Sequence, residues 1–270
     1  MVKYINKFST MKEFKLPTEV VKAESENPTN LIIFSKPKVG KTTLLAGLPN
    51  CLILDLEKGT RYVDAMKIQA ESVEDIYAIG KKIKEAGKPY TFIAIDTITA
   101  LEEMCIPYAE ILYDKTPLGK DWFAKDPQGK IIGPGKRKKE MHSILNLPNG
   151  AGYKWLRDAF TEVVNEIKSW SEHVILLGHV KDVNLEKNGA DFTAMDLDLT
   201  GKLKTAAAFK SDAIGYLYRK NNQNILSFKT SDKIACGARP LHLQNAEIVV
   251  SEVDAKGNVT TFWDKVFIKL

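Results

Sequence analysis

The stretch LIIFSKPKVGKTTLLAGL, residues 31–48, constrains the fold of this chain more than any other. An apolar run is followed by a short loop with Gly and Lys, and the loop is followed by a helical pattern. A strand, a loop of the form G-x-x-x-x-G-K-[ST] and a helix, in this order, make a phosphate-binding loop. The stretch therefore predicts an α/β fold with this loop at the carboxyl end of a buried strand.

The loop departs from that form at its first position, where Ser35 stands in place of glycine. The first Gly mainly eases the turn out of the strand. Gly40, Lys41 and Thr42 supply the close approach to phosphate, the positive charge and a metal ligand. Pro37 stiffens the start of the loop because its ring fixes φ. We expect a working loop, formed by Ser35, Lys36, Pro37, Lys38, Val39, Gly40, Lys41, Thr42 and Thr43.

The expected ligands of this loop are ATP and Mg²⁺. Backbone N–H groups of residues 38–43 would point at the phosphates, reinforced by the positive end of the helix dipole. Lys41 would reach the outer phosphates, Thr42 would bind Mg²⁺ and Thr43 would contact an inner phosphate. Nucleotide binding is therefore the first functional prediction.

Apolar runs rich in Ile, Leu and Val recur along the chain and predict the other strands of the sheet. Their hydrophobicity is continuous rather than alternating, which is typical of strands covered on both faces. The runs occupy residues 31–34, 51–54, 91–95 and 174–178. Helical stretches lie between them, at residues 43–48, 73–86, 99–112 and 153–170. This alternation predicts a mostly parallel sheet sandwiched by helices.

The two ends of the chain differ from this pattern. Residues 1–30 are polar and are expected to form an N-terminal arm or linker. After Ala213, short runs such as AIGYLYRK and AEIVVSEV are separated by the turn signals NNQN and DAKGN. Residues 213–270 are therefore expected to form antiparallel β-hairpins that extend the sheet, not a second domain.

Two acidic residues follow predicted strands and complete the candidate site. Asp96 ends the run TFIAID, and a carboxylate at the end of a strand beside the loop can hold Mg²⁺ through water. Glu57 ends the segment CLILDLE, where an acid can orient or deprotonate an attacking water. In the alternative interpretation Glu57 caps a turn and is only solvated.

Three segments, SKPKVGKTT, CLILDLE and TFIAIDTITAL, resemble the ATPase core of the RecA-type recombinases. The resemblance is greatest to the compact phage RecA-like recombinases and single-strand annealing ATPases, and it covers residues 31–220. It implies a RecA-like P-loop NTPase domain over residues 31–270. It also implies that Glu57 is the catalytic carboxylate and that Asp96 and Thr97 belong to the Mg²⁺-binding strand.

The resemblance extends to the segment HVILLGHVKD and the residues after it. It implies that His179 senses the terminal phosphate, where the recombinases usually have Gln; the alternative is an ordinary surface His at a strand end. Residues 181–210 would form a mobile loop and return segment. Lys202, Lys204 or Lys210 would reach the nucleotide of a neighbouring subunit as a trans-acting cation, or would simply be solvated.

A basic insertion, residues 113–152, is the candidate for nucleic-acid binding. The net charge of +5 is too mild to indicate nucleic-acid binding by itself. Between Asp114 and Lys154, however, nine Lys or Arg stand against four acids. Charge and aromatic rings together suit single-stranded nucleic acid, with Lys136, Arg137, Lys138, Lys139 and Trp122 as the candidate contacts. The alternative is a solvated lysine-rich loop whose aromatic side chains are buried.

These features together predict a DNA-stimulated, Mg²⁺-dependent ATPase that acts on single-stranded DNA as a phage-type recombinase or annealing protein. A ring or filament of identical subunits is expected. One alternative is a deviant-Walker partition or switch ATPase, because Lys36 lies five residues before Lys41; against it, that family has Gly-Gly where Pro37 and Lys38 stand. A helicase loader or packaging-type motor is a further alternative.

The remaining composition argues for an intracellular protein without a membrane partner. No apolar run reaches the ~18 residues of a membrane span, and the N-terminus lacks a signal-peptide pattern. Cys51, Cys105 and Cys236 lie far apart without a C-x-x-C pair, so neither disulfides nor a zinc site are expected. We expect a cytoplasmic location, in a bacterial host if the chain is phage-encoded.

Overall fold

The computed structural model describes residues 16–23, 25–122, 128, 143–187, 190–231 and 233–269. The strands are β1 (Asn30–Ser35), β2 (Cys51–Asp55), β3 (Lys67–Gln69), β4 (Phe92–Asp96), β5 (His173–Lys187), β6 (Ala190–Leu197), β7 (Ala213–Lys220), β8 (Gln223–Ser227), β9 (Gly237–Ala238), β10 (Glu247–Val253) and β11 (Val259–Thr261). The helices are α1 (Lys41–Ala46), α2 (Val73–Glu85), α3 (Ile98–Asp114), α4 (Pro117–Trp122), α5 (Ala151–Lys168) and α6 (Lys202–Phe209). Short 3₁₀ helices are η2 (Gly59–Tyr62), η4 (Ile144–Asn146), η5 (Pro148–Gly150), η6 (Leu241–Leu243) and η7 (Trp263–Lys265).

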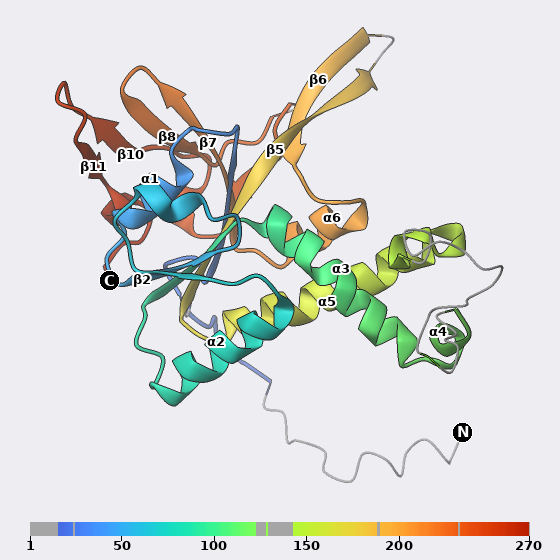
Figure 1. The fold of residues 1–270 in the computed structure, drawn as a ribbon. Helices are drawn as coiled ribbons and strands as arrows, with labels where there is room; N and C mark the ends of the chain where they lie inside the picture. The colour runs from blue at the N-terminus through green and yellow to red at the C-terminus, as the bar shows by residue number, and fades with distance from the viewer. Residues whose placement is uncertain are drawn as a thin grey trace.

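One mixed sheet forms the centre of the described part of the chain (Figure 1). Its strand order is β11-β10-β8-β7-β1-β5-β4-β2-β3, with β6 paired to β5 and β9 paired to β7. The strands from β7 to β3 along this order are parallel, whereas β8, β10 and β11 join antiparallel. The predicted α/β architecture, a mostly parallel sheet sandwiched by helices with a C-terminal antiparallel extension, is confirmed.

Parallel pairing brings polar residues of four strands to one edge of the sheet. Ser35 at the end of β1 is paired with His179 of β5, and Asp55 at the end of β2 is paired with Asp96 of β4. Because parallel strands end at the same edge, residues far apart in the sequence meet there. This edge carries the candidate site.

Apolar cores cover both faces of the sheet, as the continuous hydrophobic strands predict. Residues of β1 alternate between them: Ile32 and Phe34 belong to the core under α2, α3 and α5, and Ile33 to the core under α1. Figure 1 shows α2, α3 and α5 together on one side of the sheet. Gly80 of α2 packs closely against the ring of Trp170. A Cβ added at Gly80 would lie 2.4 Å from this ring, so a larger residue would not fit there. Both faces therefore fix the central strands in place.

The C-terminal extension holds the end of α1. The indole Nε1 of Trp263 donates to the carbonyl of Leu44 at 2.8 Å, and Thr261 Oγ1 donates to the carbonyl of Gly47 at 3.1 Å. Both carbonyls lie in the last turn of the helix or just after it, and the Leu44 carbonyl also accepts from the N–H of Gly47 at 3.3 Å. The extension thus supports the element that follows the loop.

Strand β5 continues past the sheet and forms a hairpin with β6 that projects from the body of the molecule (Figure 1). The hairpin pairs Val180 with Leu197 near its base. The recombinase resemblance implied a mobile loop and return segment over residues 181–210; this region carries the hairpin and α6, and its mobility stays a prediction. The projecting ribbon begins one residue after His179, so it starts at the edge of the candidate site.

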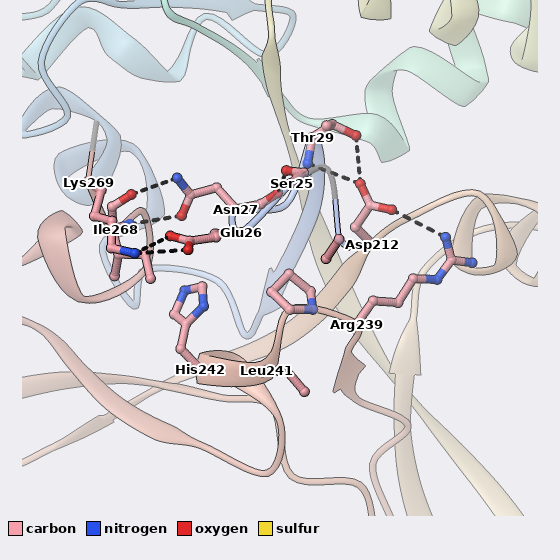
Figure 2. Close-up of a pocket in the computed structure, with 12 residues that line it drawn as sticks. Ser25, Glu26, Asn27, Thr29, Asp212, Arg239, Leu241, His242, Ile268 and Lys269 are labelled. Carbon is pink, nitrogen blue, oxygen red and sulfur yellow. Dashed lines mark hydrogen bonds and ion pairs between the residues drawn. The ribbon is translucent and has the colours of Figure 1, made fainter. Parts of the chain in front are cut away.

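A pocket of about 560 Å³ lies at the opposite edge of the sheet, between the segment before β1 and the C-terminal residues (Figure 2). Asp212 accepts hydrogen bonds from the backbone of Thr29 and Asn30 and pairs with Arg239 at 3.2 Å. Glu26 pairs with Lys269 at 2.7 Å. These paired charges tie the N-terminal arm to the end of the chain.

None of the helices in the described part of the chain combines the length and the apolar character that a bilayer crossing requires.

Candidate nucleotide-binding site

The loop between β1 and α1 has the backbone that the motif requires. Two of its residues have left-handed backbone angles: Lys38 has φ 63° and Gly40 has φ 105°. Gly40 is the position that favours glycine, because L side chains rarely adopt this φ. Its carbonyl accepts from the N–H of Leu44 at 2.9 Å, which starts the hydrogen bonding of α1. The loop therefore turns directly into the helix.

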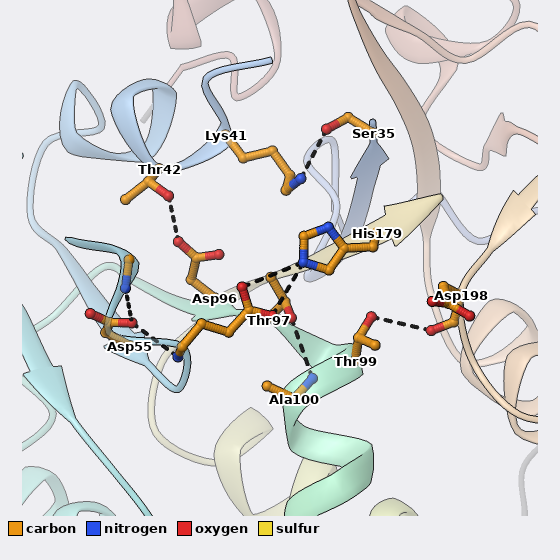
Figure 3. A network of polar contacts seen from close by, with 12 residues as sticks. Ser35, Lys41, Thr42, Asp55, Asp96, Thr97, Thr99, Ala100, His179 and Asp198 are labelled. Atoms are coloured by element: carbon orange, nitrogen blue, oxygen red, sulfur yellow. Dashed lines mark hydrogen bonds and ion pairs between the residues drawn. The ribbon is translucent and has the colours of Figure 1, made fainter. Parts of the chain in front are cut away.

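Ser35, which replaces the expected glycine, contacts the central lysine of the loop (Figure 3). Lys41 Nζ donates to Ser35 Oγ at 3.0 Å, and Ser35 Oγ donates to the carbonyl of Lys36 at 2.8 Å. Lys41 is only 7% exposed, and this burial lowers its pKa, although the nearby carboxylates Asp96 and Glu57 oppose the shift. Ser35 thus holds the buried ammonium in the loop.

Thr42 and Asp96 form the candidate metal site. Thr42 Oγ1 donates to Asp96 Oδ2 at 2.6 Å (Figure 3). Burial raises the pKa of Asp96, and the charge of Glu57 adds to this, while the Thr42 hydrogen bond and Lys41 act against it. A hydroxyl and a carboxylate oxygen are ligands that suit Mg²⁺. Because a divalent cation would compensate this buried carboxylate, the two residues fit the metal.

The candidate metal site offers two protein side chains, those of Thr42 and Asp96. The described residues contain no group of three or more His, Cys, Asp or Glu that could hold an ion by themselves. Mg²⁺ commonly keeps one or two protein ligands and completes its shell with water and substrate phosphates. Thr42 and Asp96 are therefore sufficient as the protein share of the site.

Asp55, to which the sequence analysis assigned no role, fixes the turn that carries Glu57. Its carboxylate accepts from the backbone N–H groups of Glu57, Gly59 and Thr60 at 3.1–3.2 Å and from Thr60 Oγ1 at 2.5 Å. Burial alone would raise the pKa of Asp55, but these hydrogen bonds outweigh it and lower the pKa. Lys58 within this turn is left-handed, with φ 59°. The turn is thus built around one carboxylate.

Replacing Asp55 with Asn is expected to lower the free energy of unfolding by about 2–4 kcal/mol at pH 7, because an amide N–H₂ group would face buried N–H donors. The pKa of Asp55 is lowered by folding, so its contribution is complete above the unfolded value of about 3.9 and is lost as the pH falls through the folded value. The difference between wild type and variant should therefore shrink below about pH 4.

Chemical denaturation over a pH series measures this difference. Asp158→Asn, which changes an exposed carboxylate paired with Lys154, is the matched control. Equal losses in the two variants, or a loss in Asp55→Asn that does not change with pH, would contradict the assignment.

Glu57 lies at the edge of the sheet with two polar partners. Thr97 Oγ1 donates to Glu57 Oε1 at 2.5 Å, and His179 Nε2 lies 3.2 Å from the same oxygen. The side chain of Glu57 is 37% exposed and that of His179 is 27% exposed, so both are open to a ligand. His179 Nδ1 is buried and has no hydrogen-bond partner among the described residues. Glu57 and His179 thus lie together beside Ser35 at the start of the loop, and their catalytic roles stay predictions.

The AAA domain family matches residues 27–239 of the chain. This chain belongs to the AAA domain family. A comparison with curated proteins gave no match. The family match indicates an AAA-type P-loop ATPase, and it covers the loop, Glu57, Asp96 and His179. The narrower resemblance to phage recombinases stays a prediction.

The remaining predicted site residues of this AAA domain are the other loop residues and the three candidate trans-acting lysines. Lys36, Pro37 and Lys38 are exposed, Val39 is half-buried and Thr43 is exposed. The three candidate trans-acting lysines make no contact with the loop among the described residues. Lys204 forms an ion pair with Asp196. The backbone carbonyl of Lys210 accepts a hydrogen bond from Lys168 Nζ at 3.2 Å. Lys202 is exposed at the start of α6.

The candidate DNA contacts of the AAA domain are not described. Lys136, Arg137, Lys138 and Lys139 lie outside the described residues. Trp122 ends α4, and its side chain is likewise not described. The role of the basic insertion therefore stays a prediction.

Proposed function

We propose that this AAA domain hydrolyses ATP with Mg²⁺ and acts on single-stranded DNA as an assembly of identical subunits, in the manner of a phage recombinase or annealing ATPase. The observation that carries the ATPase proposal is the meeting of Lys41, Thr42, Asp96 and Glu57 at one edge of the sheet. A cation, a hydroxyl and two carboxylates in this arrangement are the groups that phosphoryl transfer to water requires.

Each side chain has a separate task in this proposal. Lys41 would exchange the Ser35 hydroxyl for the outer phosphate oxygens of ATP, where its buried charge acts strongly. Mg²⁺ held by Thr42 and Asp96 would neutralise charge on the phosphate oxygens. Glu57, oriented by the hydroxyl of Thr97, would accept the proton of the attacking water.

His179 is proposed to respond to the terminal phosphate. Its Nε2 contacts Glu57, while Nδ1 has no partner among the described residues. The N–H of Asp198, which directly follows β6 at the base of the hairpin, donates to the carbonyl of His179 at 2.9 Å. A shift of His179 would therefore be transmitted to the base of the projecting ribbon.

Two features support single-stranded DNA as the partner. The first is the excess of lysine and arginine with aromatic residues in the insertion 113–152. The second is the ribbon of β5 and β6, which starts next to His179 and projects from the body (Figure 1). A projecting element beside the site can link nucleotide state to contact with a strand of DNA.

Single-stranded DNA is expected to raise the rate of ATP turnover. Phosphate release with and without a single-stranded oligonucleotide measures this, and duplex DNA of the same sequence serves as the comparison. A chain that neither binds single-stranded DNA nor changes its turnover would exclude the recombinase and annealing proposal. Turnover that rises only with duplex DNA would favour a packaging-type motor instead.

The basic cluster has its own test through salt dependence. Neutralising Lys136, Arg137, Lys138 and Lys139 should reduce the slope of log affinity against log salt by about 0.7 for each lost phosphate contact. A variant neutralised at the exposed lysines Lys22, Lys81, Lys82 and Lys256 loses the same charge elsewhere and is the control. Equal slopes in both variants would exclude the cluster as a phosphate contact.

Particle size separates the proposed assembly from the switch ATPase. With a non-hydrolysable ATP analogue, rings or filaments are expected. A change from monomer to dimer without larger species would favour the deviant-Walker switch, for which the exposed Lys36 is the motivating residue.

A further inference from the structure

Arg219, near the end of β7, contacts the backbone of the phosphate-binding loop. Arg219 Nη2 donates to the carbonyl of Val39 at 3.0 Å. The same guanidinium lies beside Gly40, where an added Cβ would be 3.4 Å from Nη2. Arg219 is 180 residues away from Val39 in the sequence. The contact therefore joins the C-terminal extension to the loop.

A buried pair of polar side chains fixes the orientation of Arg219. Arg219 Nε donates to Asn224 Oδ1 at 3.1 Å, and Asn224 Nδ2 donates to Ser251 Oγ at 3.0 Å. Asn224 is 4% exposed and Ser251 is 0% exposed. Buried polar side chains that satisfy one another have few alternative arrangements. The guanidinium is thus anchored from two strands, β8 and β10.

The charge of Arg219 is not neutralised by the described residues. Its hydrogen-bond partners there are a carbonyl and an amide oxygen, and it forms no ion pair with a carboxylate in the described ranges. A guanidinium keeps its charge at any ordinary pH and has five N–H donors. Arg219 therefore places a permanent positive charge beside a loop that binds a polyanion.

The bond from Arg219 to the carbonyl of Val39 fixes the orientation of the Val39–Gly40 peptide unit. The carbonyl of Val39 and the N–H of Gly40 belong to one planar trans peptide unit, so they point in opposite directions. When Arg219 holds the carbonyl of Val39, the N–H of Gly40 is directed away from Arg219. Lys38 and Gly40, on either side of Val39, are both left-handed, so this peptide unit sits in the most constrained part of the loop.

We propose that Arg219 is a positioning residue of the phosphate-binding loop, through which the C-terminal hairpins set the direction of the Gly40 N–H group for phosphate. The proposal rests on the proposed ATP-binding function for its kinetic consequence. The restraint on the loop itself does not depend on that function. Ser251, Asn224 and Arg219 form a chain of contacts that ends on the loop.

Replacing Arg219 with Gln removes the charge and the bond to Val39. We expect the KM for ATP, and the dissociation constant of a fluorescent ATP analogue, to rise about tenfold or more, because a hydrogen bond from a charged donor is lost. The kcat should change less than about threefold, because Arg219 does not contact Glu57 or the attacking water. Arg219→Lys, which keeps the charge but cannot bind two acceptors as a fork, should recover part of the affinity.

Amide hydrogen exchange tests the loop restraint without any nucleotide. In Arg219→Gln, the amides of residues 38–41 should exchange faster than in wild type, while those of the buried strand β4 should not change. Asn224→Ala should raise exchange in the same amides, because it releases the guanidinium. The control is Lys229→Gln, which removes an exposed cation of the same extension that pairs with Glu247.

The outcomes separate the two proposals. Unchanged loop exchange in Arg219→Gln would overturn the positioning role, whether or not the chain hydrolyses ATP. Faster loop exchange in a chain that does not bind ATP would support the restraint and overturn the proposed function. An equal drop in melting temperature and in loop protection for Arg219→Gln and Lys229→Gln would show a general loss of stability and would also overturn the proposal.

Discussion

Glu57→Gln is expected to lower the rate of ATP turnover by about 10²–10⁴-fold, because the amide cannot accept a proton from the attacking water. The affinity for ATP should stay near that of wild type. Gln can still accept the hydrogen bond from Thr97 Oγ1, and Asp55 holds the turn through the backbone N–H of Glu57, not through its side chain. Single-turnover phosphate release and binding of a fluorescent ATP analogue measure the two quantities.

The control for this variant is Glu71→Gln, which removes an exposed carboxylate paired with Lys58. It changes the net charge equally and lies outside the site. If Glu57→Gln turned over ATP as fast as the control, the general base would be another group. Asp55 would not take that role, because its oxygens already accept four hydrogen bonds.

Lys41→Ala is expected to reduce ATP turnover by about 100- to 1000-fold and to weaken ATP binding as well. Lys41 is the buried cation of the loop, and its contact with Ser35 is to a neutral hydroxyl, which phosphate can replace. Circular dichroism should show an unchanged fold, because the side-chain hydrogen bond of Lys41 among the described residues is to Ser35 within the same loop. The measurement is phosphate release together with analogue binding.

Lys36→Ala is the matched control in the same loop, since Lys36 is exposed. A loss in Lys36→Ala as large as that in Lys41→Ala would contradict the assignment and would favour the switch ATPase, in which this lysine acts. A normal Lys36→Ala with an inactive Lys41→Ala supports the loop as described.

Local sequence patterns predicted the parts of the site that depend on neighbours in the chain. The strand, the loop and the helix around Lys41 follow one another directly, so the motif was sufficient. Asp96 and Glu57 were found because each follows an apolar strand, and parallel pairing brings such ends together. Their contacts with Thr42 and Thr97 then follow from the topology.

Two contacts of the loop were not predicted. The hydrogen bond from Lys41 to Ser35 forms only when the loop folds back on itself. The phosphate-loop motif does not indicate this bond, because it has glycine at the position of Ser35. Arg219 reaches Val39 from a hairpin that no local pattern links to the loop. Asp55 had a local signal in the turn sequence DLEKGT, where a carboxylate precedes a Gly and a Thr that can donate to it.

The first helix and the hairpin of β5 and β6 differ from what the sequence and the family resemblance led us to expect. The first helix spans Lys41–Ala46 rather than residues 43–48, because its hydrogen bonding starts at the carbonyl of Gly40 and Gly47 caps its end. The hairpin of β5 and β6 stood in a region expected to be a mobile loop. The dipeptide Asn188-Gly189 in the sequence is a strong signal for a tight hairpin turn and would have indicated it.

Phosphate release from ATP by the wild-type chain, compared with Lys41→Ala in the presence of Mg²⁺ and of a chelator, tests the central claim most directly. Wild type should turn over ATP with Mg²⁺, and removal of the metal should reduce this rate to that of the variant. Equal rates in wild type and Lys41→Ala, or turnover that persists without the metal, would contradict the claim that Lys41, Thr42 and Asp96 form a Mg²⁺-dependent ATPase site.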